Sequence, residues 1–294
     1  MNHKDNIISS LLSAVKYLII LVVAAGLAGA ISLRMLDVAG IRYTQISWDE
    51  LTRRISNLEE DSSTVDELEE LSHSPLYQKK IVYDGDSIAE SRKNNGGGYA
   101  KLIAEATGST YVNQAVSGAR LTSRESSHSV VDNLVNLPDD ADLYCFEGGI
   151  NDWWGNVPIG TCNPNDYEGE LDTSTICGAM ETIFRHCLNN FPGKPVCFVI
   201  THKIQKTAYS PNQNGDTVED YRNAMVAVCQ KYSIPYYDAF NESGLNGWNE
   251  VQNELYLNSN ATGKGDGCHP NEEGYKRYYV PQLLDLFERM LPME

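Results

Sequence analysis

The chain has 294 residues, of which 41% are hydrophobic and 21% are charged, a composition typical of folded globular proteins rather than disordered ones. This length accommodates one sizeable α/β domain and a short additional module, because a single core usually holds about 100 to 250 residues. The formal net charge of −17 at pH 7 argues against nucleic acid as a partner, because binding to phosphate requires clustered Lys and Arg.

An uncharged apolar run, YLIILVVAAGLAGAISL, occupies residues 17–33. This length lies near the lower limit for a helix that spans a bilayer, and a soluble helix rarely lacks a polar face over so many residues. We therefore predict an amino-terminal tail and a single transmembrane anchor over residues 1–38. The alternative is a cleaved signal peptide followed by secretion, with Lys4 and Lys16 before the apolar run and AGA at residues 28–30 as the cleavage pattern.

The charges around the apolar run bear on the side of the membrane. Four arginines follow the run within residues 34–54, so the positive-inside rule alone would leave the domain in the cytoplasm. A short amino-terminal tail before a first apolar segment is also typical of export signals, so we expect the domain that follows to be extracytoplasmic.

Residues 39–78 are acidic and contain Leu51, Ile55 and Leu58 at roughly heptad spacing. This pattern predicts a helical stalk between the anchor and the rest of the chain. The heptad register breaks at Ser62, so we favour a solvated stalk over a coiled coil that oligomerises the protein.

Short apolar runs alternate with amphipathic stretches from residue 79 to residue 294, the pattern typical of a parallel sheet covered by helices. Strands are predicted at 81–84, 110–114, 142–147, 196–201 and 235–240. Helices are predicted at 99–107, 129–137, 179–190, 218–232 and after Asn271. Thr217 and Asp220 predict a capping box at the start of the fourth of these helices.

Seven cysteines are scattered between residues 145 and 268 without a CxxC pair, which argues against a zinc finger. Cys162 and Cys177 bracket a polar loop and would be able to form a disulfide if the domain lies outside the cytosol. The sequence leaves that pairing open.

Two polar motifs follow predicted strands, at the edge of a parallel sheet where sites are usually built. GDSI at residues 85–88 places Ser87 at a strand-to-helix turn, where its hydroxyl is exposed and its backbone N–H points toward a developing oxyanion. GGIND at residues 148–152 offers the side-chain amide of Asn151, a donor that does not ionise. Each motif alone is weak evidence, because most serines at such turns cap a helix and most Gly-Gly-x-Asn segments close a turn.

A third motif, DGCHPN at residues 266–271, precedes the last predicted helix. Its spacing lets the Asp266 carboxylate reach Nδ1 of His269, which leaves Nε2 to take a proton from a serine. The segment NQAVSGA contains Gly118, whose backbone N–H is a further candidate donor. Together these residue types predict a serine hydrolase.

The motifs resemble the four blocks of the SGNH (GDSL-type) hydrolase superfamily, in which Ser, Gly, Asn and His occur in that chain order. In this sequence the matching residues are Ser87, Gly118, Asn151 and His269, and the resemblance extends over about residues 80–291. It implies a flavodoxin-like three-layer α/β/α fold and ester hydrolysis without a metal or another cofactor. It also implies Ser87 as the nucleophile, Asp266 and His269 as the rest of the triad, and an oxyanion hole of the Ser87 and Gly118 N–H groups with the Asn151 side chain.

The segment VYDGDS permits a second interpretation. Asp84-x-Asp86 after an apolar strand also resembles the opening of the haloacid-dehalogenase phosphatases, in which Asp84 would be the nucleophile and Mg²⁺ would be required. We do not favour it, because the later Lys and the paired acids that such enzymes need are not evident in the sequence.

Candidate substrate-binding residues are Trp153 and Trp154, which directly follow the GGIND segment, and His202, which follows the fourth strand. Packing of the loop explains the tryptophans equally well. Long loops at 201–215 and 241–265 are expected to form the walls of an open cleft. Their aromatic, polar and acidic residues favour a short acyl ester, such as an O-acetyl group on a carbohydrate. One alternative is a lipid-directed esterase or thioesterase of the lysophospholipase type, which the predicted membrane anchor would favour. Another is a non-catalytic surface protein of the same fold.

Overall fold

The computed structural model describes residues 74–91, 98–123, 128–258 and 264–291. The predicted anchor at 1–38 and the predicted stalk up to residue 73 lie outside these residues. Within the described ranges, no helix is both long enough and apolar enough to cross a membrane.

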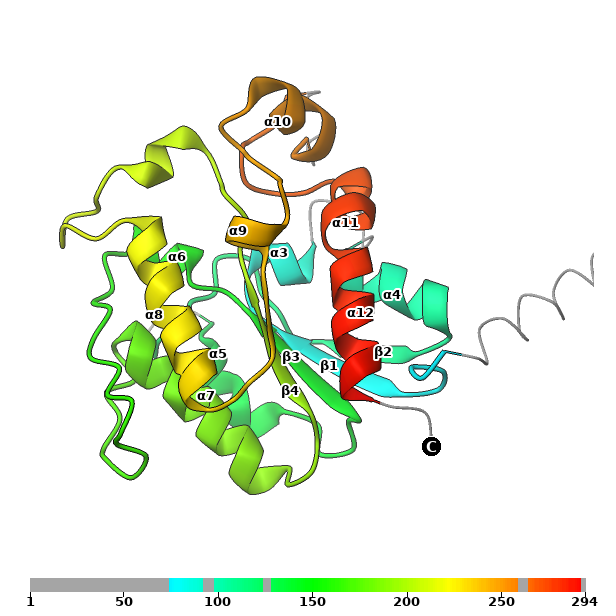
Figure 1. Cartoon of the computed structure of the whole chain (residues 1–294), viewed down its shortest axis with the longest axis vertical. Coiled ribbons are helices and arrows are strands. Elements are labelled where there is room, and N and C mark those ends of the chain that lie inside the picture. Colours follow the sequence, from blue (N-terminus) through cyan, green and yellow to red (C-terminus); the bar gives the residue numbers. More distant parts are fainter. Residues whose placement is uncertain (1–73, 92–97, 124–127, 259–263, 292–294) are drawn as a thin grey trace, which may run out of the picture. The chain divides into compact units, whose positions relative to one another are not determined.

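Five parallel strands form one sheet, in the spatial order β2-β1-β3-β4-β5 (Figure 1). They are β1 (Lys80–Asp84), β2 (Thr110–Asn113), β3 (Leu143–Glu147), β4 (Val196–Ile200) and β5 (Tyr236–Asp238). The side chains of the three central strands are buried almost throughout, as expected for a sheet that is covered on both faces. The chain moves outward from β1 to β2 and then returns to β3, so the carboxyl ends of β1 and β3 border the crevice where open α/β sheets bind ligands.

Helices cover both faces of this sheet (Figure 1). One face carries α5 (Val130–Asn133), α7 (Ile176–Asn190) and α8 (Val218–Lys231). The other face carries α4 (Tyr99–Thr107), α11 (Glu272–Tyr278) and α12 (Val280–Met290). The three layers and the strand order agree with the predicted flavodoxin-like α/β/α fold.

Most predicted elements lie close to their observed positions. The predicted helix at 129–137 is α5 followed by the short 3₁₀ helix η2 (Leu134–Asn136). The capping box at Thr217 is present, with the Thr217 side chain accepting from the Asp220 N–H. The predicted last helix is two helices, because Pro281 in the first turn of α12 has no N–H to continue α11.

Short helices lie at the carboxyl ends of the strands and replace stretches that we predicted as strand or loop (Figure 1). They are α3 (Ser87–Glu90), α6 (Ile150–Trp154), η3 (Lys206–Tyr209), α9 (Ala239–Glu242) and α10 (Glu250–Tyr256). The predicted strand at 235–240 ends at Asp238 because α9 begins there. The predicted loop at 241–265 contains α10, which has no buried residue and therefore carries little of the apolar pattern that indicates a helix.

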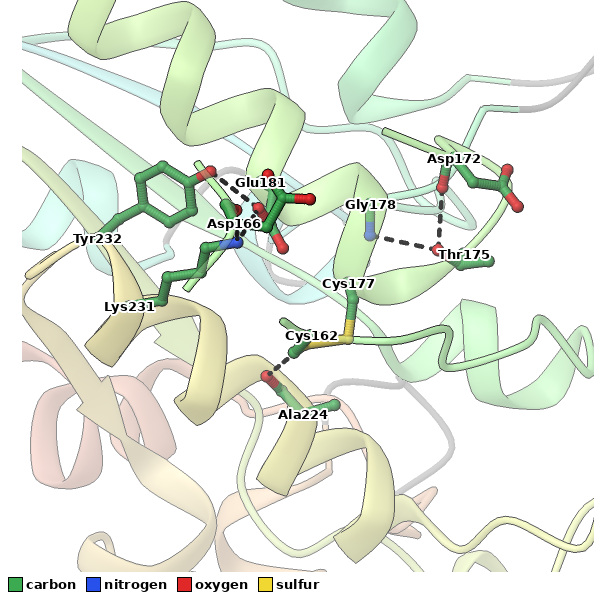
Figure 2. Close-up of a disulfide and its surroundings, with 10 residues drawn as sticks. All are labelled: Cys162, Asp166, Asp172, Thr175, Cys177, Gly178, Glu181, Ala224, Lys231 and Tyr232. Carbon is green, nitrogen blue, oxygen red and sulfur yellow. Dashed lines mark hydrogen bonds and ion pairs between the residues drawn. A yellow bond between two sulfur atoms is a disulfide. The ribbon is translucent and has the colours of Figure 1, made fainter. Parts of the chain in front are cut away.

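A disulfide joins Cys162 to Cys177, the second residue of α7 (Figure 2). The other five cysteines lie outside this disulfide and are buried. Next to the disulfide, Lys231 of α8 pairs with Glu181 of α7 at 2.6 Å and donates a hydrogen bond to the Asp166 carbonyl, also at 2.6 Å. The disulfide and Lys231 therefore both attach the loop that precedes α7 to the helical layer.

Candidate active site

Ser87 lies at a tight turn between β1 and α3, and Gly85 makes that turn possible. A Cβ atom on Gly85 would lie 2.5 Å from the Glu147 carbonyl oxygen, and its φ of 157° is strained for other residues. The ends of β1 and β3 therefore approach more closely than a side chain would allow. Asp86 caps α3 by accepting a hydrogen bond from the Ile88 N–H at 2.9 Å. Ser87 follows as the first helical residue and is half-buried at the carboxyl edge of the sheet.

The structure brings Ser87, His269 and Asp266 together from opposite ends of the domain. Ser87 Oγ lies 2.8 Å from His269 Nε2, although the two residues are 182 positions apart. His269 Nδ1 lies 2.8 Å from Asp266 Oδ2. A carboxylate at Nδ1 fixes the proton on that nitrogen, so Nε2, which faces Ser87 Oγ, is the ring nitrogen that can accept a proton.

Asp266 is held as an anion within its own loop. Burial alone would raise its pKa, but hydrogen bonds from the His269 side chain, the His269 N–H and the Cys268 N–H outweigh burial and lower the pKa. The two backbone bonds measure 2.8 Å and 2.9 Å. The carboxylate therefore stays charged at neutral pH and is able to stabilise an imidazolium.

Helix α10 holds the loop that carries Asp266 and His269. Asn253 Oδ1 accepts a hydrogen bond from the Gly267 N–H at 2.7 Å. The Leu257 carbonyl accepts from the Asp266 N–H at 3.1 Å, and the Tyr256 carbonyl accepts from the Asn271 N–H at 2.8 Å. Asn253 was not among the predicted site residues, because nothing in the local sequence pattern connects it to a loop that follows it.

The predicted oxyanion-hole residues lie around Asn151 on α6. Asn151 Nδ2 donates to Asp86 Oδ2 at 3.1 Å and to the Ala119 carbonyl at 3.0 Å, so it contacts the neighbours of Ser87 and Gly118. Gly118 has a φ of 81° and an exposed position. Glu90 of α3 accepts the adjacent Ser117 N–H at 2.6 Å and so ties this turn to the serine helix. Among the described residues, no group accepts a hydrogen bond from the backbone N–H of Ser87 or Gly118.

Asp152, the residue after Asn151, connects α6 to the segment that follows Gly118. It is fully buried and accepts hydrogen bonds from the Leu121 N–H at 3.0 Å, the Thr122 N–H at 3.2 Å and Thr122 Oγ1 at 2.7 Å. Burial raises the pKa of this carboxyl group in spite of these bonds. Asp152 therefore positions two parts of the predicted oxyanion hole relative to each other.

The three candidate substrate-binding residues differ in exposure. Trp154 is 43% exposed on α6, whereas Trp153 is 6% exposed and donates from Nε1 to the Asp216 carbonyl at 3.0 Å. His202 is 0% exposed and its Nδ1 lies 2.6 Å from the Tyr279 hydroxyl. Burial lowers the pKa of His202 to about 3, so the ring is neutral. Trp153 and His202 are therefore buried, as the packing alternative allows for Trp153, and Trp154 is the one of the three with a large exposed surface.

Asp84, the nucleophile in the phosphatase interpretation, does not face solvent. It is fully buried and its two oxygens accept from the Gly85 N–H and from Asn133 Nδ2, both at 2.8 Å. Burial raises its pKa to about 6. In the part of the chain that the structure describes, no three His, Cys, Asp or Glu side chains are grouped so as to hold a metal ion.

Comparison with known proteins places these residues in a family. A model of the GDSL-like lipase/acylhydrolase family matches residues 85–277, from the GDSI motif into α11. No curated protein sequence matches the chain.

Several solved structures share the fold. A protein from Lactobacillus plantarum is 22% identical over 72% of this chain and 98% of its own, with a TM-score of 0.62. A possible lipase from Chitinophaga pinensis is 19% identical over 72% of this chain and 98% of its own, with a TM-score of 0.56. A catalytic mutant of an acetylxylan esterase from Geobacillus stearothermophilus is 19% identical over 74% of this chain and 96% of its own, with a TM-score of 0.45. For the first two structures, the likeness at these identities is one of fold and not of substrate.

Proposed function

Because the chain belongs to the GDSL-like lipase/acylhydrolase family and is therefore an ester-bond hydrolase, we propose that it cleaves its ester through an acyl-enzyme on Ser87. The observation that carries this proposal is the continuous line of contacts from Ser87 Oγ through the His269 ring to Asp266, with both distances at 2.8 Å. A serine hydroxyl is a weak nucleophile unless a base takes its proton, and His269 Nε2 is in position to do so.

The proposed reaction has two halves. Ser87 Oγ attacks the ester carbonyl carbon while its proton moves to His269 Nε2, and the Asp266 carboxylate stabilises the resulting imidazolium. The tetrahedral intermediate collapses, the C–O bond to the alcohol breaks, and His269 returns the proton to the leaving oxygen. Water then repeats the attack on the acyl-enzyme with His269 as the base, which releases the acid and restores Ser87.

The negative charge on the tetrahedral oxygen needs donors in place before the reaction. The backbone N–H groups of Ser87 and Gly118 are available for this role. Asn151 supplies the third donor: the N–H on Asp86 holds the amide in place, and the N–H on the Ala119 carbonyl is the one that the oxyanion would share.

The leading substrate class is a short acyl ester on a neutral carbohydrate. The net charge of −17 opposes anionic substrates at long range. The exposed Trp154 and Trp248, at 43% and 52%, offer flat apolar faces of the kind on which sugar rings stack.

The direct test compares the wild-type protein with Ser87→Ala on p-nitrophenyl acetate and on acetylated oligosaccharides. We expect a loss of about 10⁴-fold or more in kcat for Ser87→Ala, with an unchanged circular dichroism spectrum. Ser123→Ala, at a serine whose hydroxyl donates to Asp132 outside the triad, is the matched control and should keep its activity. A fluorophosphonate should label the wild-type protein at Ser87 in a one-to-one ratio. Full activity of Ser87→Ala would refute the serine mechanism.

A lipid-directed esterase is the second candidate, because apolar side chains are exposed beside the loop of the catalytic base. Trp248, Val251 and Leu255, at and before α10, are 52%, 66% and 56% exposed. Profiling esters with acyl chains from two to twelve carbons separates the candidates. A preference for acetyl supports the carbohydrate ester, whereas a preference for long chains replaces it with the lipid ester. Labelling of Ser87 would exclude the non-catalytic alternative, because an unactivated serine does not react.

We further propose that residues 17–33 anchor the protein in a membrane as a single span, with the catalytic domain outside the cytoplasm. The disulfide between Cys162 and Cys177 supports this location, because disulfides persist in oxidising compartments. In membranes prepared from expressing cells, the full-length protein should resist extraction by alkaline carbonate. Release into the medium of a chain that lacks the apolar run would instead indicate a cleaved signal peptide.

A further inference from the structure

Glu147 is a buried carboxyl group beside the candidate active site that the proposed reaction does not use. It ends β3, is 0% exposed, and its Oε1 accepts a hydrogen bond from Thr201 Oγ1 at 2.7 Å. If the side chain of Glu147 were ionised, its Oε2 would have no hydrogen-bond donor among the described residues. Such an oxygen is costly to bury, so its contacts require an explanation.

The carboxyl group of Asp86 supplies that explanation. The turn at Gly85 brings Asp86 against the end of β3, and the Asp86 and Glu147 carboxyl groups lie close enough for a hydrogen bond between them. Two carboxylates offer acceptors only, so this hydrogen bond requires a proton on one of them.

The proton belongs on Glu147. Asp86 accepts two N–H groups, from Ile88 at 2.9 Å and from Asn151 Nδ2 at 3.1 Å, and both bonds favour its ionised form. Glu147 accepts from the Thr201 hydroxyl at Oε1 and also interacts with the Asp86 N–H, but no donor at hydrogen-bond distance reaches its Oε2, whereas both oxygens of Asp86 have one. Burial, followed by the charge of Asp86, raises the pKa of Glu147 well above its usual value.

We infer that Glu147 is a neutral acid and a positioning residue for the oxyanion hole: its proton bonds to Asp86, and Asp86 in turn holds the Asn151 amide. This inference rests on the proposed function, in which Asn151 donates to the oxyanion. It assigns no contact with the substrate to Glu147, which acts through Asp86.

The surrounding groups are compatible with a neutral Glu147. The ionisable side chains that interact with the pair are Asp152 on α6, His269, and the phenols of Tyr99, Tyr275 and Tyr279. The phenols are uncharged at neutral pH, because burial raises the pKa of all three. None of these groups is a permanent cation that would hold Glu147 ionised.

Infrared spectroscopy tests the protonation state without reference to activity. The difference spectrum between the wild-type protein and Glu147→Gln at neutral pH should contain the C=O stretch of a neutral carboxylic acid that the variant lacks. Carboxylate bands in its place would overturn the inference. Glu181→Gln is the matched control, because Glu181 is also buried but pairs with Lys231, so its difference spectrum should contain carboxylate bands.

Kinetics test the positioning role. Glu147→Gln keeps a donor toward Asp86 and an acceptor toward Thr201, so it should retain kcat to within about threefold, whereas Glu147→Met should lower kcat by about 10- to 100-fold with little change in KM. In a background that carries Asn151→Ala, Glu147→Met should cost no further activity, because the residue through which it acts is already absent. Equal losses in Glu147→Gln and Glu147→Met, or a full additional loss in the Asn151→Ala background, would overturn the positioning role.

The two proposals fail in different ways. A wild-type protein that hydrolyses no ester would refute the proposed function, while the infrared result would still decide whether Glu147 is neutral. An active wild-type protein with an ionised Glu147 would refute only the inference. If Glu147→Met does not fold, the infrared comparison and the kinetics of Glu147→Gln decide alone.

Discussion

The two halves of the candidate active site are held in different ways. Ser87 and Asn151 lie at the ends of central strands, and the carboxyl groups behind them, Asp86 and Asp152, are buried. Asp266 and His269 lie on an irregular loop that backbone hydrogen bonds and α10 hold from outside the sheet. We call the first group, Ser87 and Asn151 with Asp86 and Asp152, the nucleophile half, and the second group, Asp266 and His269, the base half. The nucleophile half is part of the core, whereas the base half is attached to the core by hydrogen bonds.

This difference separates catalysis from stability. Loss of a buried carboxyl group in the nucleophile half, Asp86 or Asp152, should disturb folding and activity together, because the same buried groups serve both. A change in the base half should reduce activity while most of the fold remains, because few apolar contacts depend on that loop. Four substitutions test this contrast, in order of decreasing expected effect.

Asp266→Asn should have the largest effect on activity in the base half. The amide would favour the wrong tautomer of His269, and we expect kcat to fall by about 10⁴-fold. The free energy of unfolding should change by less than about 2 kcal/mol, because an amide oxygen can still accept the two backbone N–H groups at this turn. Urea denaturation alongside ester hydrolysis measures both, and a large loss of stability would contradict the separation.

Asp152→Ala, in the nucleophile half, should lower the stability of the protein strongly, unlike Asp266→Asn. It leaves the donors of Leu121 and Thr122 buried without an acceptor, which we expect to lower the free energy of unfolding by about 3 to 5 kcal/mol. Thermal and urea unfolding measure this loss. Asp172→Ala, at an exposed aspartate of the loop before α7, is the control and should stay within about 1 kcal/mol of the wild-type protein. Wild-type stability in Asp152→Ala would show that this half is not core.

The response to pH should also differ between the halves. Burial raises the pKa of Asp84 to about 6, so the folded protein binds this proton more tightly than the unfolded chain does. The contribution of protonated Asp84 to stability is therefore present at low pH and is lost as pH rises from about 4 to about 6. The free energy of unfolding changes by at most about 3 kcal/mol over this range. The lowered pKa of Asp266 has the opposite sign: its contribution is present above the unfolded pKa and is lost as pH falls.

Asp84→Asn should remove the first of these contributions. Relative to the wild-type protein, the variant should gain about 1 to 3 kcal/mol in the free energy of unfolding between pH 4 and pH 7, measured by urea denaturation. The nearby His128, 3.6 Å from Asp84, remains in both proteins. The exposed Asp285→Asn is the control, and a difference between Asp84→Asn and wild type that does not vary with pH would count against the buried proton.

Asn253→Ala should have the smallest effect. Loss of the acceptor for the Gly267 N–H loosens the loop of Asp266 and His269, and we expect kcat to fall by about 10-fold with a small loss of stability. Asn253→Asp keeps the acceptor and should restore most of the activity. Glu254→Ala, at an exposed neighbouring residue on α10, should behave as wild type. Equal kcat values in all three variants would show that α10 does not position the base.

The contrast between the halves also explains which elements and site residues could be predicted from the sequence. The strands could be predicted because central parallel strands are continuous apolar runs. Ser87, Asn151 and His269 could be predicted because each lies in a short motif at a strand end or before a helix. Residues that act only through tertiary contacts, such as Glu147 and Asn253, carry no local signal. His202 was placed correctly at the end of β4, but the pattern does not say whether such a side chain turns toward the cleft or the core.

The pairing of Cys162 with Cys177 has a consequence for how the protein is made. The free thiols of Cys145 and Cys197 lie opposite each other on neighbouring strands, sealed in the sheet once it has formed. A chain that reaches an oxidising compartment before its sheet closes exposes all of its cysteines to the same oxidant. If the chain is exported unfolded, as the proposed location implies, the yield of correctly paired protein depends on a disulfide isomerase or on rapid collapse of the central strands.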